Sequence, residues 1–243
     1  DEIAAVAAGA AGLFVTNSQA LTVAEVDTVI AQRVQADGTT ANEADTANLS
    51  DATTITNGGS IVLATAAGDL TVTDGGDADA LGVDADQGGD VLLSSAANAA
   101  IEAIVQSDTG NITVVANTDV TQTAAGDILV QGGAGTIDVE AQTGSITMAD
   151  GAIAQTADAN IRYKAAQNVA VGELLAGTGD AGVEATAGNI TDADGGAGND
   201  VTANELRLTA GGNIATGADH IETTVDEIAA VAAGAAGLFV TNS

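Results

Sequence analysis

Residues 110–148 read GNITVVANTDVTQTAAGDILVQGGAGTIDVEAQTGSITM and contain one short phrase four times. The phrase is GNITV at 110–114, GDILV at 126–130, GTIDV at 135–139 and GSITM at 144–148. Glycine and the short polar residue after it favour a turn, because glycine tolerates unusual backbone angles and Asn, Asp or Ser side chains bond to nearby backbone. The two apolar residues that follow, two positions apart, point to the same side of a strand. Each phrase therefore predicts a turn followed by a short, half-buried strand.

The phrase returns along most of the chain, and its spacing predicts how the strands are arranged. Steps of eight or nine residues suit successive faces of one coil, whereas steps near twenty suit the same face of the next coil. We therefore expect an all-β chain folded as a parallel β-solenoid, with loops that leave irregular coils. Asn111, Asn160, Asn168, Asn189 and Asn213 recur at turn positions, where their side chains are able to stack as ladders. Eleven copies, some without the glycine, begin their apolar pair at 61, 70, 91, 112, 128, 137, 146, 161, 169, 190 and 214.

Composition limits both the core and the class of partner. The 243 residues include 31 glycines, no proline, no cysteine, no tryptophan, and only Phe14, Tyr163 and Phe239 as aromatics. The core must therefore be narrow and filled by Ile, Val, Leu and Ala. Asp and Glu number 34 against four Lys and Arg, a net charge of −30, which excludes nucleic-acid binding because that needs many cationic side chains. The longest apolar stretch, 228–240, is too short to span a bilayer, so we expect no membrane insertion.

The first 18 residues, DEIAAVAAGAAGLFVTNS, are repeated without change at 226–243. An identical match of this length does not arise by chance. We interpret residues 1–225 as one period of a tandem repeat that forms a continuous β-solenoid, and residues 226–243 as the start of the next period. The expected partners are then the preceding and following copies, stacked end to end, with lateral self-association as a further mode of assembly to test.

Three segments depart from the phrase. Residues 24–35 place apolar side chains four apart, as on one face of a helix, which predicts a short helix. In 224–234, Thr, Asp and Glu precede an Ala-rich run, which predicts a second short helix. The alternative for both segments is an irregular excursion from the column of coils. The stretch 37–56 is polar and lacks the phrase, so we expect a long loop there.

Two stretches resemble the large secreted haemagglutinin-like repeat proteins of bacteria, which are related in style to filamentous haemagglutinin: NDVTANELRLTAGGNI (199–214) and AGTIDVEAQTGSITMADGAIAQTADANIRY (134–163). The likeness covers most of residues 57–243. It implies a right-handed β-helix and an extracellular or cell-surface location. The implied function is that of a structural repeat unit in a giant fibre, such as an adhesin stalk, sheath or matrix filament. The family pattern has no catalytic residues to match here, so we expect no enzyme activity and no required cofactor.

Acidic, glycine-rich loops are the main candidates for a ligand site. Aspartate and glycine concentrate in TDGGDADALGVDADQGGD (73–90) and TDADGGAGND (191–200), and oxygen ligands on a bendable backbone suit Ca²⁺. GGAGND at 195–200 is similar to one nonapeptide of a calcium-binding β-roll, but Thr202 stands where a large apolar residue is expected and no tandem copy follows. The alternative is that both loops are simply a solvated acidic surface. The candidate calcium ligands are Asp84, Asp86, Asp90, Asp192, Asp194 and Asp200.

Two other functions stand beside the structural fibre. A calcium-dependent binding or secretion module of a surface adhesin would fold only when cations neutralise its charge. A polysaccharide-active enzyme on a β-helix would need paired carboxylates in a groove and an aromatic platform, for which only Tyr163 is available. The single histidine, His220, has no cysteine or second histidine for a zinc site and no G-x-S-x-G motif to serve. Arg162, Tyr163 and Lys164 form the one basic spot, which we interpret as an ion-pair partner for the acidic surface.

Overall fold

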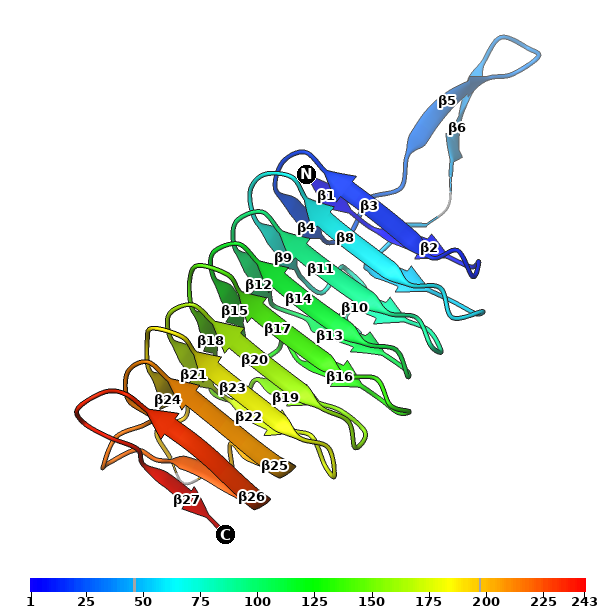
Figure 1. Cartoon of the computed structure of the whole chain (residues 1–243). Helices are drawn as coiled ribbons and strands as arrows, with labels where there is room; N and C mark the ends of the chain where they lie inside the picture. The colour runs from blue at the N-terminus through cyan, green and yellow to red at the C-terminus, as the bar shows by residue number, and fades with distance from the viewer. Residues whose placement is uncertain (46, 197) are drawn as a thin grey trace.

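The chain forms a rod of stacked coils in the computed structural model, which describes residues 1–243 except Thr46 and Ala197 (Figure 1). Every regular element among those residues is a β-strand, so the prediction of an all-β parallel solenoid is confirmed. Each regular coil carries three short strands, and equivalent strands of successive coils pair in parallel to give three faces, which we call A, B and C. The two termini lie at opposite ends of the rod (Figure 1).

Face A is an eight-stranded sheet of strands two or three residues long. In each three-residue strand the first and third side chains point into the rod and the middle one points outward, as period-two alternation requires. The strands are β1 (Glu2–Ile3), β4 (Leu21–Val23), β9 (Leu70–Val72), β12 (Ala99–Ile101), β15 (Val120–Gln122), β18 (Ile146–Met148), β21 (Val169–Val171) and β24 (Ile190–Asp192).

Faces B and C together form a 17-stranded sheet, because β25 (Val201–Ala210) and β26 (Ile221–Ala232) run through both. Along the chain, face B is followed by face C and then by face A. Face B contains β2 (Ala5–Ala7), β7 (Ala52–Thr54), β10 (Leu81–Ala85), β13 (Ile104–Ser107), β16 (Ile128–Val130), β19 (Ile153–Gln155), β22 (Glu173–Leu175), the first parts of β25 and β26, and β27 (Val240–Asn242). Face C contains β3 (Leu13–Asn17), β8 (Ile61–Thr65), β11 (Val91–Ser95), β14 (Ile112–Ala116), β17 (Ile137–Ala141), β20 (Ile161–Ala165), β23 (Ala181–Ala185) and the second parts of β25 and β26.

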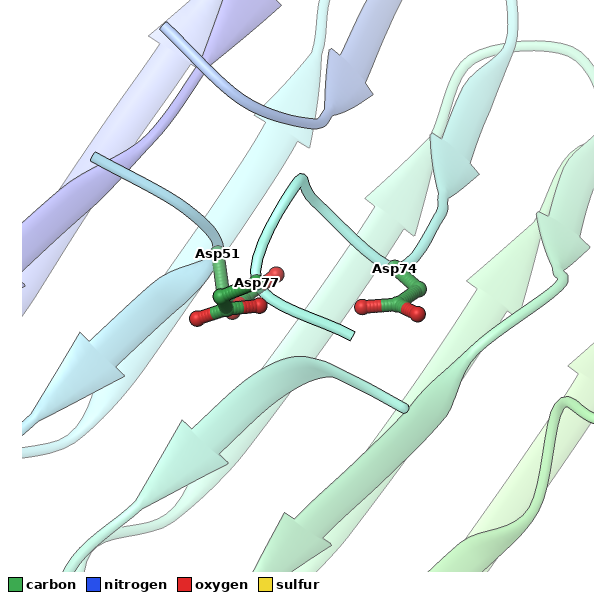
Figure 2. A group of neighbouring side chains, drawn as sticks. All are labelled: Asp51, Asp74 and Asp77. Carbon is green, nitrogen blue, oxygen red and sulfur yellow. The ribbon is translucent and has the colours of Figure 1, made fainter. Parts of the chain in front are cut away.

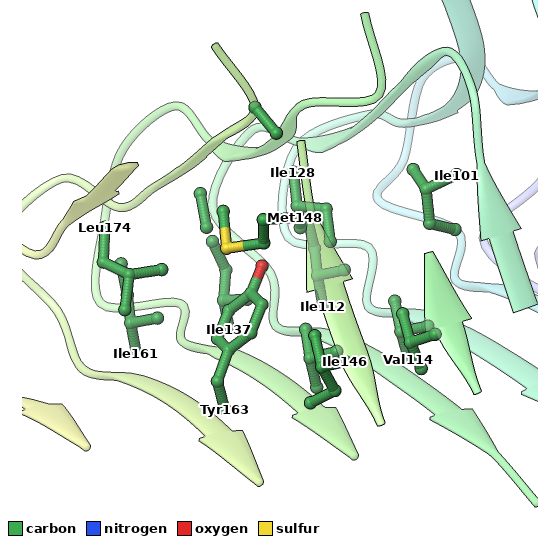
Figure 3. Packing of buried hydrophobic residues seen from close by; sticks show 14 of the residues in the cluster. Ile101, Ile112, Val114, Ile128, Ile137, Ile146, Met148, Ile161, Tyr163 and Leu174 are labelled. Carbon is green, nitrogen blue, oxygen red and sulfur yellow. The ribbon is translucent and has the colours of Figure 1, made fainter. Parts of the chain in front are cut away.

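The core is a thin column of aliphatic side chains in register. On face C, Ile112 pairs with Ile137 and Ile137 pairs with Ile161, and all three are at most 1 % exposed (Figure 3). Tyr163 is the one large ring in this column and is fully buried. Its hydroxyl donates to Oε1 of Gln122 at 2.9 Å, because a buried phenol needs a polar partner. The apolar pair of one phrase therefore stacks on the pair of the next coil.

The turn asparagines form ladders, as the sequence suggests. At the corner between faces C and A, the backbone N–H of Asn189 donates to Oδ1 of Asn168 at 2.9 Å, and that of Asn213 donates to Oδ1 of Asn189 at 2.8 Å. Asn111 and Asn160 accept a backbone N–H from the next coil in the same way at the corner between faces B and C. These side chains tie successive coils together where the backbone turns and strand pairing stops.

Three long connections leave the rod at one corner, between face A and face B of the next coil. They are residues 24–51, 73–80 and 193–200. The first carries a two-stranded antiparallel arm, β5 (Ile30–Val34) with β6 (Thr40–Ala44), which projects away from the rod (Figure 1). Irregular spacing of the phrase therefore reflects loops inserted at this corner, as expected.

Of the two alternatives for the segments that lack the phrase, the short helix is wrong for both, whereas the excursion from the column is confirmed for residues 24–35, which belong to the arm. Residues 24–35 contain strand β5 rather than a helix, because a spacing of four also places side chains on one side of a strand. Residues 224–234 continue strand β26, since parallel pairing with β25 overrides the helix propensity of alanine. The expected loop at 37–56 includes β6 and β7, and only Thr46 within it lies outside the described residues. The described part of the chain has no helix long and apolar enough to cross a bilayer.

Candidate functional site

The corner between face A and the next face B gathers carboxylates into two clusters. The first unites three of the candidates taken from the sequence, Asp192, Asp194 and Asp200, whose carboxylate oxygens lie within 4.8 Å of one another. Asp192 and Asp200 are buried, whereas Asp194 is exposed. The loop 193–200 therefore closes on itself and brings both of its ends together beside face B.

Backbone hydrogen bonds shape this first cluster. Asp192 is the last residue of β24, and its two carboxylate oxygens accept the N–H groups of Asp194 at 2.9 Å and Gly195 at 3.0 Å, which makes a tight turn. Asp200 precedes β25, and its Oδ2 accepts the N–H of Glu222 at 2.7 Å. The loop is thereby fixed both to the end of face A and to strand β26 of the following coil.

The first cluster holds more carboxylate than its hydrogen bonds satisfy. Burial, together with the neighbouring carboxylates of Asp192, Asp194 and Glu222, raises the pKa of Asp200 to about 8. Burial also raises the pKa of Asp192 to about 6, assisted by the carboxyl groups of Asp194 and Asp219. Oδ1 of Asp219 and Oε2 of Glu222 are buried without a hydrogen-bond partner in the described part of the chain. This corner therefore either retains protons at neutral pH or attracts a cation.

The second cluster contains Asp51, Asp74 and Asp77, whose oxygens also lie within 4.8 Å of one another (Figure 2). Asp51 is 4 % exposed, adopts a left-handed backbone conformation with φ 63°, and accepts the N–H of Gly75 at 3.2 Å. Burial raises the pKa of Asp51 to about 6. The sequence indicates the acidic loop that holds Asp74 and Asp77, but Asp51 follows the arm, and only the stacking of coils brings it to them.

The other three candidates do not form a cluster among the residues that the structure describes. Asp84 points outward on β10 and accepts Nε2 of Gln106 at 3.0 Å. Asp90 belongs to the ladder at the corner between faces B and C, where it accepts the N–H of Asn111 at 2.8 Å. Asp86 precedes the same corner, and its N–H donates to the hydroxyl of Thr54 at 3.1 Å. In the GGAGND stretch, Ala197 lies outside the described residues.

Both clusters offer only oxygen atoms, which are the ligands that Ca²⁺ and Mg²⁺ prefer. Each combines at least one buried carboxylate with exposed ones, so a cation could enter from solvent and be held against the rod. Such a cation would offset the carboxylate repulsion that raises the pKa of the buried members.

The aromatic and histidine side chains considered for catalysis have structural contacts. Tyr163 is fully buried, so it does not offer a platform to a sugar. The ring of His220 stacks on Phe239 with centroids 5.9 Å apart, and its Nδ1 lies 2.7 Å from the hydroxyl of Thr241. These contacts fasten the last coil.

The basic spot is paired with acids, as its interpretation required. Nε of Arg162 lies 2.7 Å from Oδ1 of Asp138, and its Nη2 lies 3.2 Å from Oε2 of Glu140. Nζ of Lys164 lies 4.0 Å from the other oxygen of Glu140. All four side chains lie on the outer side of face C and are partly exposed, so each pair contributes at most about 1 kcal/mol to stability.

No family model matches this sequence, and no curated protein and no solved structure is similar enough to it to count as a match.

Proposed function

We propose that this chain is a structural segment of an extracellular fibre, in which copies stack end to end and lengthen one continuous solenoid. The observation that supports the proposal best is that the column of coils is open at both ends, and that the same 18-residue sequence forms the first and the last coil. A fibre of this kind needs no catalytic group, because its function is length, stiffness and resistance to unfolding. The resemblance to secreted haemagglutinin-like repeats supports the extracellular location.

The open ends expose apolar side chains and backbone groups that a further coil would cover. In the first coil, Ile3, Leu13 and Val15 pack against the core but are only partly buried, and in the last coil the same is true of Ala230 and Val240. The edge strands of these coils also present backbone groups that pair on one side only. A further copy would bury the apolar side chains and complete the parallel pairing, and each coil would then contact only its neighbours.

The test is electron microscopy of a chain with two periods, made by adding residues 19–225 after Ser243 and closing with a third copy of residues 1–18. Nine strands stack on face C, which gives a rod of about 40 Å at about 4.8 Å per strand. We expect the two-period chain to be a single straight rod of about twice the length of the one-period rod. A Gly-Ser linker inserted after Ser243 provides the control that should break it. Two separate particles without the linker would overturn the proposal.

A second candidate function, cation-dependent stabilisation, is favoured by the buried carboxylates of the first cluster. Here a divalent cation would bind Asp192, Asp194 and Asp200 and fasten the loop to β26. Thermal unfolding at pH 7.5 with EDTA or with millimolar CaCl₂ tests it on the intact chain. Ca²⁺ at one hundred times its dissociation constant would add about 2.7 kcal/mol to the free energy of unfolding. Equal melting temperatures in both buffers, or an equal gain for a variant with Asp192→Asn and Asp200→Asn, would exclude this function.

A further inference from the structure

The outer side of face C is divided into a neutral half and a charged half. Its outward side chains lie in two columns along the rod, set by the strand register. From β3 to β14 neither column contains an ionisable residue, although the chain carries 34 acids. From β17 onward the columns hold most of the charged residues of this face, including three of the four cations of the chain. The columns read Phe14, Val62, Leu92, Thr113, Asp138, Arg162, Gly182, Arg207, Ala229 and Thr16, Ala64, Ser94, Val115, Glu140, Lys164, Glu184, Thr209, Val231.

One column contains a protruding ring and a hollow. Phe14 is 65 % exposed at the neutral end and forms one wall of a shallow groove over Val62 and Leu92. At the charged end, a hollow of about 120 Å³ lies over Gly182 between Arg162 and Arg207. The hollow stays open because Arg162 turns its guanidinium group toward Asp138. A Cβ atom on Gly182 would meet none of the described residues within 4 Å, so the space above this position is open.

The ring and the hollow are placed symmetrically about Thr113. In the strand order of face C, Phe14 lies three strands before Thr113 and Gly182 lies three strands after it, each about 14 Å away along the rod. We propose that a second copy of this chain packs on face C in the antiparallel direction, about a two-fold axis at Thr113, so that Phe14 of each copy fills the hollow over Gly182 of the other. The contact does not depend on end-to-end stacking.

The distribution of charge along face C supports a second copy as the partner, because the antiparallel arrangement avoids contacts between like charges. The two-fold axis places the charged side chains of β17, β20 and β23 opposite neutral ones, with Glu140 opposite Ser94, Lys164 opposite Ala64 and Glu184 opposite Thr16, while Arg207 lies one strand beyond Phe14 of the other copy. A parallel arrangement would instead place Glu140 against Glu140. In the proposed arrangement the Phe14 ring enters between two arginines, where a cation–π contact is favourable.

The size of the contact also suits a weak, specific dimer. Seven strands of about five residues give about 500 Å² per copy, or about 1,000 Å² in total, which is the lower limit for a specific interface. The arm does not interfere, because it leaves the rod at the corner between faces A and B. The net charge of −30 opposes association, so salt should strengthen it by screening.

Single cysteines test the arrangement cleanly, since the chain has none. Sheets pack about 10 Å apart, so a bis-maleimide of that reach should join two copies of Thr113→Cys across the axis. Thr53→Cys, at an outward position on face B, is the matched control. We expect Thr113→Cys to cross-link at least ten times faster than Thr53→Cys, and faster still with added NaCl. Equal rates would overturn the proposal.

Filling the hollow tests the specific contact. Gly182→Val adds a β-branched side chain at an open strand position, so the melting temperature should stay the same or rise. In the Thr113→Cys background, Gly182→Val or Phe14→Ala should lower the cross-linking rate to that of the Thr53→Cys control. Rapid cross-linking that neither substitution changes would contradict the insertion of Phe14 over Gly182.

Discussion

The two copies of DEIAAVAAGAAGLFVTNS have the same residues but lie on different faces of the rod. In the first copy, Glu2–Ile3 pairs on face A, Ala5–Ala7 on face B and Leu13–Asn17 on face C. In the second copy, residues 227–232 pair on face C, and Val240–Asn242 pairs on face B. Each part of the segment therefore lies on a different face in the two copies, and the parts have not all moved in the same direction along the coil.

Equivalent side chains consequently have different surroundings. Phe14 is 65 % exposed on face C, whereas Phe239 is partly buried and stacks on His220. Leu13 packs against the core, whereas Leu238 is 42 % exposed and bridges Ile214. Identical local sequence therefore does not determine the face on which a segment lies.

The neighbouring strand along the chain decides the face instead. The first copy must lead into β4 on face A, while the second copy continues from the face B part of β26. Alanine and glycine, which dominate the segment, are small enough to fit any face, so they impose no preference of their own. In a continuous fibre, one copy of the segment would have to follow the face B part of β26 and also lead into β4 on face A. It can adopt only one of the two arrangements seen here. The two-period chain would show which one.

The largest difference in stability is expected between a substitution in the middle of the rod and one in the repeated segment. Ile137→Ala removes a side chain that is 1 % exposed and stacked between Ile112 and Ile161, and should lower the free energy of unfolding by about 2–5 kcal/mol. Leu13→Ala, in the partly covered first coil, should cost about half as much or less. Urea unfolding followed by circular dichroism measures both. Equal losses would mean that the end coil is as well packed as the middle and would remove the basis of the comparison.

The regular coils could be predicted from sequence because their rule is local. A glycine, a polar turn residue and an apolar pair are all within five residues of one another, and Ile112, Ile137 and Ile161 each obey this rule. The repeated segment obeys it poorly, so its strands and faces depend on contacts with coils more than twenty residues away. The helix prediction for 224–234 failed for the same reason, because parallel pairing overrides alanine propensity only once the neighbouring strand is in place.

The candidate site was predictable only where its ligands are close in sequence. Asp192, Asp194 and Asp200 lie in one loop, and they do come together. Asp51 joins Asp74 and Asp77 across one full coil, and a distance of more than twenty residues leaves no local signal. The sequence predicts Asp90 as a calcium ligand, and the structure places it in a ladder, where its carboxylate accepts a hydrogen bond from the next coil.

Acidity should affect the two ends of the rod over different pH ranges. A carboxyl group with a raised pKa binds its proton more tightly when folded, so stability falls as pH rises from the unfolded value of about 4 to the folded value. This range ends near pH 6 for Asp51, near the first copy, and near pH 8 for Asp200, which holds β26. Hydrogen exchange of peptides that include unique flanking residues should show β26 losing protection as the pH rises from 6 to 8. The first coils should lose protection below pH 6.

Asp200→Asn should remove the upper part of this pH dependence. At pH 8 and without divalent cations, we expect it to raise the free energy of unfolding by more than about 1.4 kcal/mol, the equivalent of one pKa unit. Asp90→Asn, in the ladder, is the matched control, because it makes the same substitution outside both carboxylate clusters. An unaltered profile for Asp200→Asn would show that Asp200 is not the group that titrates.

The two phenylalanines should respond differently to the same substitution. Phe239→Ala removes the ring that stacks on His220 and should cost about 1–2 kcal/mol, whereas Phe14→Ala removes an exposed ring and should change stability by less than about 0.5 kcal/mol in the dilute monomer. Urea unfolding at low micromolar concentration measures both. Similar losses would indicate that the two copies share one environment after all.

The smallest effect should come from the asparagine of each copy. Nδ2 of Asn242 donates to the carbonyl of Val225 at 3.1 Å while its Oδ1 accepts the N–H of Val225 at 3.1 Å, so the side chain closes the backbone pairing of β26. Asn17 donates to Asp1 and to the carbonyl of Ala20 in exposed positions that water can take over. We expect Asn242→Ala to cost about 1 kcal/mol and Asn17→Ala about half of that, because only the first leaves partly buried backbone groups without a partner. In the two-period chain the joint contains one such asparagine between two complete coils. The loss of stability when this asparagine is replaced by alanine would then show whether the joint adopts the arrangement of the first copy or that of the second.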